Sequence, residues 1–403
     1  MKKFLALALA LVMALSLFAC GDSNASTSTA PSSAPENSTP ANTPDGSGGE
    51  EGGEILIGCL QDVTGPTSAL GISVQTGAQA AVDEINANGG VGGKTIVMKT
   101  YDTKGDVTEA VNAFITAVTV DKVSLLVGPP VANIANAIKE TSEDYDVPVL
   151  GLAMDPACQT RDDGTAYTNM FALQPSATSQ GAIMAAFAVK NGYKTYGILY
   201  NQENSYSVSL LAPFTDELAK SNITVDDNLI VAYGAADKDY KTLLQPIVSA
   251  GVDAIYCPNY TQDLVAIYTA AVELGYSGKI IAGLDAAPAF NTTYGGDCSN
   301  VYYINNINTE DADIAAEIAK IAGSVSAPNK YFLGYDIVMA AADCIEKVGT
   351  DYSALHGALE NLVYEGVTGT ITIDPATHMP TGMSMYMYTY DNQDPVMLEQ
   401  FGG

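Results

Sequence analysis

The fold is decided by residues 55–100, which read ILIGCLQDVTGPTSALGISVQTGAQAAVDEINANGGVGGKTIVMKT. The apolar run Ile55-Leu56-Ile57 predicts a buried strand. A helix is predicted over 71–88, because apolar and small residues recur there at helical spacing. This face comprises Val74, Gly77, Ala78, Ala81, Val82 and Ile85. A second strand is predicted over 95–100, and a strand, helix and strand in succession are typical of a βαβ unit in a parallel sheet.

Short apolar runs and amphipathic segments continue to alternate along the chain. A first series adds helices 107–119 and 132–145 and strands 124–127 and 148–150. A second series adds helices 178–190, 206–220, 239–249 and 262–274 and strands 196–200, 223–231, 253–256 and 279–282. Because 403 residues exceed the length at which one hydrophobic core usually keeps growing, we expect an α/β fold of two doubly wound, Rossmann-like lobes. Ligands of such sheets bind beyond the carboxyl ends of the strands.

The N-terminus has the layout of an export signal, with Lys2-Lys3, an apolar run over 4–18, and then Ala19-Cys20. We therefore expect residues 1–19 to be a signal peptide. The Leu-Phe-Ala-Cys run ending at Cys20 resembles the lipobox of bacterial lipoproteins, which implies a lipid on Cys20; an ordinary signal with an incidental cysteine is the alternative. Residues 20–53 hold no large apolar side chain, so we expect a disordered tether rich in Ser, Thr, Pro, Gly and Glu.

The chain carries 46 acidic and 17 basic residues, a formal net charge of −29. Nucleic acids and anionic surfaces repel such a chain, so we expect no nucleic-acid partner and membrane contact through the lipid anchor only. The remaining cysteines are widely spaced and form no CxxC or Cys/His cluster. We expect buried thiols, with one disulfide left open, at Cys59, Cys158, Cys257, Cys298 and Cys344.

Motifs of catalysis and metal binding are absent from the sequence. No GxSxG elbow occurs, and no GxGxxG follows a predicted strand. His356 and His378 lack metal-ligand spacing, and we expect both to be polar surface residues. The segment 89–95 looks like a phosphate-binding loop, but it follows a helix and precedes a strand, so we expect a glycine C-cap and turn. We expect no enzyme activity, no cofactor and no metal.

Several segments together resemble the leucine/isoleucine/valine-binding protein family. The opening motif is the most specific, and later segments match loosely over about residues 54–390. The matching segments are Gln61-Asp62-Val63-Thr64-Gly65-Pro66, Glu84-Ile85-Asn86-Ala87-Asn88-Gly89-Gly90-Val91-Gly92-Gly93, Val127-Gly128-Pro129, Gly251-Val252-Asp253-Ala254 and Gly283-Leu284-Asp285.

The resemblance implies a type I periplasmic-binding fold, in which three crossings near Gln174, Leu284 and Met383 form a hinge. Lobe 1 would then comprise 54–174 plus 284–383, and lobe 2 would comprise 175–283 plus 384–403. It also implies an extracytoplasmic solute-binding protein that delivers an amino acid to the permease subunits of an ABC importer.

The resemblance further implies how a zwitterion would be held between the lobes. The family's serine and threonine positions are Ala132 and Met154 here, so both hydroxyls are missing, and main-chain groups around Ala132 and Ala153 are left to bind the ligand carboxylate. Asp263 is our first choice for the ammonium, although its place near a helix start also suits a charge that stabilises that helix. Asp285 lies where the family often carries an acid.

Leu70, Tyr206 and Tyr260 align with bulky positions of the family's cleft, and with Met154 they would enclose an apolar side chain; packing in a lobe core is the alternative for each. We therefore expect an aliphatic, branched-chain-like amino acid as ligand. Because both hydroxyls are missing, an amide, a short carboxylate or an aromatic acid remains open. A ligand-sensing receptor subunit is the alternative from another functional class.

Overall fold

The computed structural model describes residues 53–284 and 290–402. The expected signal peptide, nearly all of the tether, Cys20 and Asp285 lie outside these residues. No helix within the described ranges combines the length and the hydropathy that a membrane crossing requires.

A first parallel sheet has five strands in the order β2-β1-β3-β4-β5. Its strands are β1 (Glu54–Gln61), β2 (Thr95–Asp102), β3 (Leu126–Val127), β4 (Val149–Gly151) and β5 (Met170–Ala172). The helices that follow or cover them are α1 (Ser68–Ala87), α2 (Val107–Ile115), a π-helix (Thr116–Asp121), α3 (Ala132–Ser142), α11 (Pro328–Val348) and α12 (Tyr352–Glu360). We call this sheet and its helices the first lobe.

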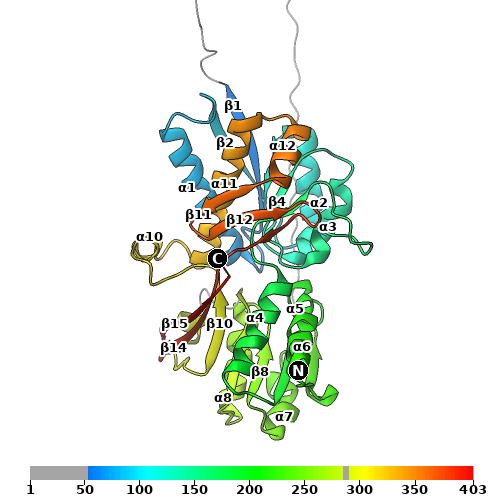
Figure 1. Cartoon of the computed structure of the whole chain (residues 1–403), viewed down its shortest axis with the longest axis vertical. Helices are drawn as coiled ribbons and strands as arrows, with labels where there is room; N and C mark the ends of the chain where they lie inside the picture. Colours follow the sequence, from blue (N-terminus) through cyan, green and yellow to red (C-terminus); the bar gives the residue numbers. More distant parts are fainter. Residues whose placement is uncertain (1–52, 285–289, 403) are drawn as a thin grey trace, which may run out of the picture. The chain divides into compact units, whose positions relative to one another are not determined.

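Helix α1 packs closely against α11, although the two are far apart in the sequence (Figure 1). A Cβ on Gly77 would lie 1.9 Å from the carbonyl oxygen of Tyr331, and a Cβ on Gly334 would lie 2.3 Å from that of Val74. The two glycines therefore let the helix backbones approach each other. All six residues of the predicted face of α1 are buried, so that prediction is confirmed.

A second sheet has seven strands in the order β15-β14-β10-β9-β8-β6-β7. Five strands are mutually parallel: β6 (Tyr196–Asn201), β7 (Ile230–Tyr233), β8 (Ala254–Cys257), β9 (Lys279–Ala282) and β10 (Val301–Asn305). The hairpin of β14 (Met385–Asp391) and β15 (Asp394–Phe401) joins them antiparallel. The intervening helices are α4 (Ala177–Lys190), α5 (Ser205–Ser209), α6 (Leu211–Lys220), α7 (Tyr240–Ala250), α8 (Thr261–Glu273) and α9 (Phe290–Tyr294). We call this sheet and its helices the second lobe, and with it the predicted pair of doubly wound lobes is confirmed.

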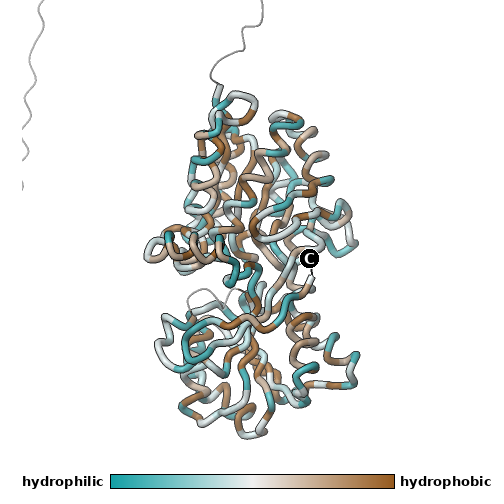
Figure 2. Tube along the Cα trace, turned by 60° about the vertical axis from the view of Figure 1, so that its left-hand side comes forward, coloured by the Kyte–Doolittle hydropathy of each residue, from teal (hydrophilic) through white to brown (hydrophobic). Residues whose placement is uncertain are grey.

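Smaller elements complete the chain. A three-stranded sheet of β11 (Val363–Gly366), β12 (Gly369–Asp374) and β13 (Met379–Thr381) adds Ile371 and Ile373 to the first lobe's core. Helix α10 (Ala312–Ile321) lies between β10 and α11 in the sequence, and short 3-10 helices span Pro156–Cys158 and Asp227–Leu229. In Figure 2, hydrophobic and hydrophilic stretches alternate along the helices, as expected where one face of a helix packs on a sheet.

The expected lobe boundary near Leu284 differs from the structure. Strand β10 pairs in parallel with β9, with Val301 opposite Ile280, so the second sheet continues to Asn305. The chain reaches the first lobe again only through α10 and α11. Adjacent parallel strands must be joined by a crossover, and the connection that contains α9 serves β9 and β10 rather than a passage between lobes.

Two further expectations from the sequence agree with the structure. The glycine segment is the expected turn, with positive φ at Gly89, Gly90, Gly92 and Gly93 between α1 and β2. The five described cysteines are free and buried, as expected.

The surface expectation for the histidines was wrong. His378 is only 3% exposed and stacks on Phe171 with ring centroids 4.1 Å apart, while His356 is half-buried on the same phenylalanine. Burial lowers the pKa of both rings.

Candidate functional site

Three of the expected ligand-binding residues, Leu70, Tyr260 and Asp263, line one cavity of about 240 Å³. One wall follows β1 and the other begins α8, after β8, so the cavity joins the carboxyl ends of strands from both sheets. Its full lining is Pro66, Thr67, Ala69, Leu70, Tyr260, Thr261, Gln262 and Asp263. The loop after β1 of the first sheet and the start of α8, which follows β8 of the second sheet, thus meet at the carboxyl ends of the strands, where ligands of such sheets bind.

The loop after β1 is shaped by Asp62, a residue of the opening motif to which the sequence assigned no role of its own. Its buried carboxylate accepts hydrogen bonds from the main-chain N–H groups of Gly65 and Thr67 and from the Thr67 hydroxyl, at 2.5, 2.8 and 2.7 Å. A Cβ on Gly71 would lie 2.0 Å from the Asp62 carbonyl oxygen. The opening motif therefore folds this loop and presents Leu70, and the spacing of an aspartate and two glycines was the signal available in the sequence.

An aromatic pair forms the second-lobe side of the site. The rings of Tyr206 and Tyr260 stack with centroids 5.2 Å apart and an interplanar angle of 7°. Tyr206 is buried, and a Cβ on Gly283 would lie 2.1 Å from its hydroxyl, so a larger residue at 283 would force the Tyr206 side chain to shift. Tyr260 lines the cavity, whereas Tyr206 is not among its lining residues and reaches the site only through this stacking contact.

The other described candidates surround this pair. Ala132 and Ala153 belong to the buried cluster that contains Leu70, whereas Met154 belongs to the cluster that contains Tyr206. Tyr260 packs against both clusters. Six of the seven described candidates, all but Asp263, therefore lie in or against two apolar clusters that meet at Tyr260, and core packing explains their burial as well as ligand contact would.

Helix α3 begins beside these residues without a side-chain cap. Val131 is the capping residue and its side chain accepts no hydrogen bond, whereas Asp106, Ser176, Asp239 and Asp351 cap α2, α4, α7 and α12. Within the described chain, no group accepts a hydrogen bond from the main-chain N–H of Ala132. Free N–H groups and the helix dipole make this end of α3 suitable for a carboxylate.

The Asp263 carboxylate is engaged within the second lobe. It accepts hydrogen bonds from the hydroxyls of Tyr233 and Tyr240, at 3.0 and 2.8 Å, and Lys238 Nζ lies 3.3 Å away. Burial, and then the hydrogen bond to Asp263, raise the pKa of Tyr240, so this hydroxyl stays a donor. Asp263 also lies in the first turn of α8, in agreement with the alternative that it stabilises this helix.

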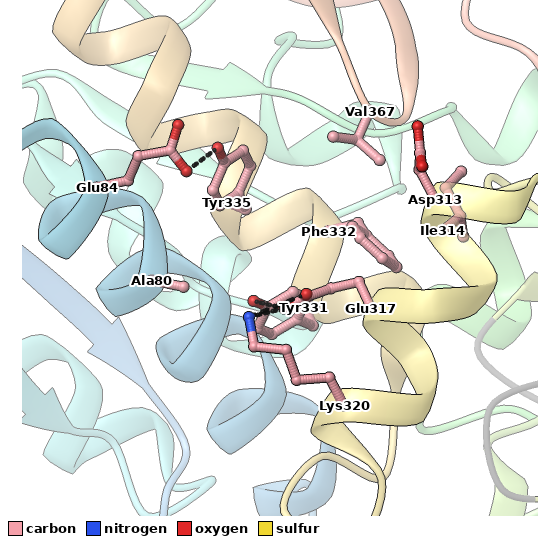
Figure 3. Close-up of a pocket in the computed structure, with 10 residues that line it drawn as sticks. All are labelled: Ala80, Glu84, Asp313, Ile314, Glu317, Lys320, Tyr331, Phe332, Tyr335 and Val367. Atoms are coloured by element: carbon pink, nitrogen blue, oxygen red, sulfur yellow. Dashed lines mark hydrogen bonds and ion pairs between the residues drawn. The ribbon is translucent and has the colours of Figure 1, made fainter.

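A separate cavity of about 320 Å³ lies among α1, α10 and α11 (Figure 3). It contains none of the expected site residues. Two of its carboxylates already have partners, since Glu84 accepts from Tyr335 and Glu317 accepts from Tyr331 and Lys320. Among the residues that the structure describes, no group of His, Cys, Asp and Glu side chains is arranged to hold a metal ion.

Comparison with known proteins agrees with this geometry. The family model described as periplasmic binding protein matches residues 54–395. The chain belongs to the periplasmic binding protein family. Its family is one of binding proteins, and the relatives below are binding proteins as well.

Among members of the periplasmic binding protein family, the Leu/Ile/Val-binding protein BraC3 of Rhizobium johnstonii is 27% identical over 76% of this chain and 84% of its own length. The branched-chain amino acid transporter substrate-binding protein LivJ of Streptococcus pneumoniae, solved with isoleucine, has a TM-score of 0.72 and 26% identity. That match covers 86% of this chain and 100% of LivJ.

A solute-binding protein from R. palustris, solved with 4-hydroxybenzoate, has a TM-score of 0.75 at 17% identity, covering 87% of this chain and 97% of its own. That likeness shows the fold alone. Periplasmic binding proteins of this fold thus hold chemically different solutes, and the ligand has to be argued from the side chains.

Proposed function

We propose that this chain is the extracytoplasmic solute-binding protein of an ABC importer and that it captures an aliphatic amino acid between its lobes. The observation that carries the proposal is the meeting of Leu70 from the first lobe with Tyr260 and Asp263 from the second in one cavity. The Leu/Ile/Val-binding relatives support the same ligand class. The proposal includes a lipid on Cys20 that would keep the protein at the membrane.

The proposed ligand would be held at three points. Main-chain N–H groups at the start of α3, around Ala132, with those around Ala153, bind the carboxylate. Leu70, Met154 and the stacked tyrosines enclose the aliphatic side chain.

Asp263 remains our candidate for the ammonium. The ligand would displace Lys238, whose 3.3 Å contact is the longest of the three that the carboxylate makes. The Asp263 carboxylate would then supply the opposite charge that an ammonium group needs when it is removed from water.

Isothermal titration calorimetry with the twenty amino acids, benzoate, 4-hydroxybenzoate and an aliphatic amide tests the proposal. We expect leucine, isoleucine or valine to bind most tightly. A panel in which only an aromatic acid or the amide binds contradicts the ligand assignment, and silence across the panel rejects it.

Substituting Ala132→Pro tests the carboxylate site within the same titration. Proline at the first helical position keeps the helix but lacks the N–H, and Val131 already has the extended backbone that precedes proline, with φ −130° and ψ 147°. We expect at least a tenfold loss of affinity, because a hydrogen bond to a charged group is worth about 1.5–3 kcal/mol.

Ala312→Pro is the matched control for that substitution. Ala312 begins α10 after Asp311, whose backbone is also extended, and it lies outside the cavity. Equal affinities for the two proline variants, with equal thermal stability, contradict the proposed carboxylate site.

A further inference from the structure

An exposed side chain of α3, that of Asn133, bonds from the first lobe to the second. Asn133 Nδ2 donates a hydrogen bond to the carbonyl oxygen of Glu203 at 3.1 Å, and Asn133 Oδ1 accepts one from the main-chain N–H of Ser205 at 2.9 Å. Asn133 lies in the first turn of the first-lobe helix α3, whereas Glu203 and Ser205 flank the start of the second-lobe helix α5.

The two bonds have the pattern of a parallel β-ladder. In such a ladder, one residue donates its N–H to the carbonyl before its partner and accepts with its C=O from the N–H after it; here the Asn133 carboxamide takes that part, and the partner is Asn204. Only a carboxamide side chain offers a donor and an acceptor in this arrangement. The contact therefore depends on the chemistry of asparagine and not on surface polarity in general.

The segment that Asn133 contacts is held in shape by its own lobe. Asn201 Oδ1 accepts from the Glu203 N–H at 2.9 Å, and Asn204 Oδ1 accepts from the Tyr206 N–H at 3.0 Å. Glu203 Oε2 accepts from the Ala235 N–H at 2.9 Å. Because the segment is already ordered, the Asn133 contact costs little further ordering entropy.

Both ends of the contact adjoin the proposed ligand site. Asn133 directly follows Ala132, whose N–H we assign to the ligand carboxylate, and Ser205 directly precedes Tyr206 of the aromatic pair. We propose that Asn133 is a latch that holds the lobes closed over the bound solute and thereby sets the rate at which the solute leaves. For the identity of the solute, this inference rests on the proposed function.

The test compares Asn133→Ala and Asn133→Asp with the unmodified protein. The alanine variant removes both bonds, whereas the aspartate variant keeps an acceptor for Ser205 and loses the donor to Glu203. Asn136→Ala is the control, because Asn136 lies one turn later in α3 and bonds within its own lobe, to Asp155 at 3.4 Å. Asn133 is exposed, so both variants should unfold at the same temperature as the parent.

Stopped-flow kinetics with leucine should show about tenfold faster dissociation for Asn133→Ala and little change in association. NMR-detected hydrogen exchange should show faster exchange of the Ser205 amide in Asn133→Ala, and protection retained in Asn133→Asp. The latch is overturned if Asn133→Ala has the same dissociation rate and the same Ser205 exchange rate as the parent. It is also overturned if Asn136→Ala accelerates dissociation as much as Asn133→Ala does.

The two proposals fail in different ways. If the unmodified protein binds no amino acid, the proposed function is rejected, and Ser205 exchange alone then decides the latch. Faster exchange in Asn133→Ala supports the interlobe contact in that case, and unchanged exchange overturns it.

Discussion

At the scale of the residue, Asp263 shows how far sequence reasoning reaches. Its place after a strand and at a helix start was readable, and it does line the cavity. Its partners were not, because Tyr233 ends β7 and Tyr240 begins α7, and only the folded chain brings them to within 3.0 Å of the carboxylate. If this carboxylate bonds both to the two hydroxyls and to a ligand ammonium, its removal should change both the stability of the protein and its affinity for the ligand.

Asp263→Asn should therefore lower both stability and affinity. Loss of the charged acceptor should reduce the free energy of unfolding by about 1.5–3 kcal/mol, measured by urea denaturation. Affinity for leucine should fall about tenfold, while affinity for its des-amino analogue 4-methylpentanoate should not.

Asp162→Asn, in an exposed turn, should change neither quantity and serves as the control. If Asp263→Asn loses stability but binds leucine as before, the carboxylate is structural and the ammonium has another partner.

At the scale of the element, the order of most strands and helices up to residue 282 was predicted from the apolar pattern, whereas the elements after it, including the long helix α11, were not. Within the predicted part, the sequence failed where a local exception decided the outcome. The single helix expected over 206–220 is divided into α5 and α6 at Leu210, because Pro213 lacks the N–H that would bond to the Ser209 carbonyl. Strands β3 and β5, of two and three residues, are too short to show a period, and β5 was missed.

Replacing a helical glycine by alanine should change stability in opposite directions at two positions, one inside the close contact of α1 and α11 and one outside it. Gly77→Ala should destabilise the protein by about 1–3 kcal/mol, since its Cβ would overlap the Tyr331 carbonyl oxygen, which belongs to backbone that cannot easily shift. Gly357→Ala in α12 should stabilise it by about 0.5–1 kcal/mol, because nothing lies within 4 Å of the added Cβ. Urea denaturation of both variants checks this, and a gain in stability at Gly77 would falsify the packing described for these helices.

At the scale of the whole molecule, two doubly wound sheets followed from chain length and alternation. The second sheet's full extent did not, because β10, β14 and β15 acquire their positions through pairing with strands that are distant in the sequence, such as Tyr303 opposite Tyr388. For the same reason His378 could not be recognised as buried, since the ring that covers it, Phe171, lies on β5. The local apolar pattern therefore predicts individual helices and strands. Which side chains are buried, which groups bond to one another and where a lobe ends depend on residues that are distant in the sequence.

The most direct test of the central claim is a crystal structure of this protein with the amino acid that binds most tightly in the calorimetric panel. We predict the ligand between the lobes, in contact with Leu70 of the first lobe and Tyr260 of the second, with its carboxylate at the start of α3. A ligand held by one lobe alone, or in the cavity among α1, α10 and α11, would contradict the account.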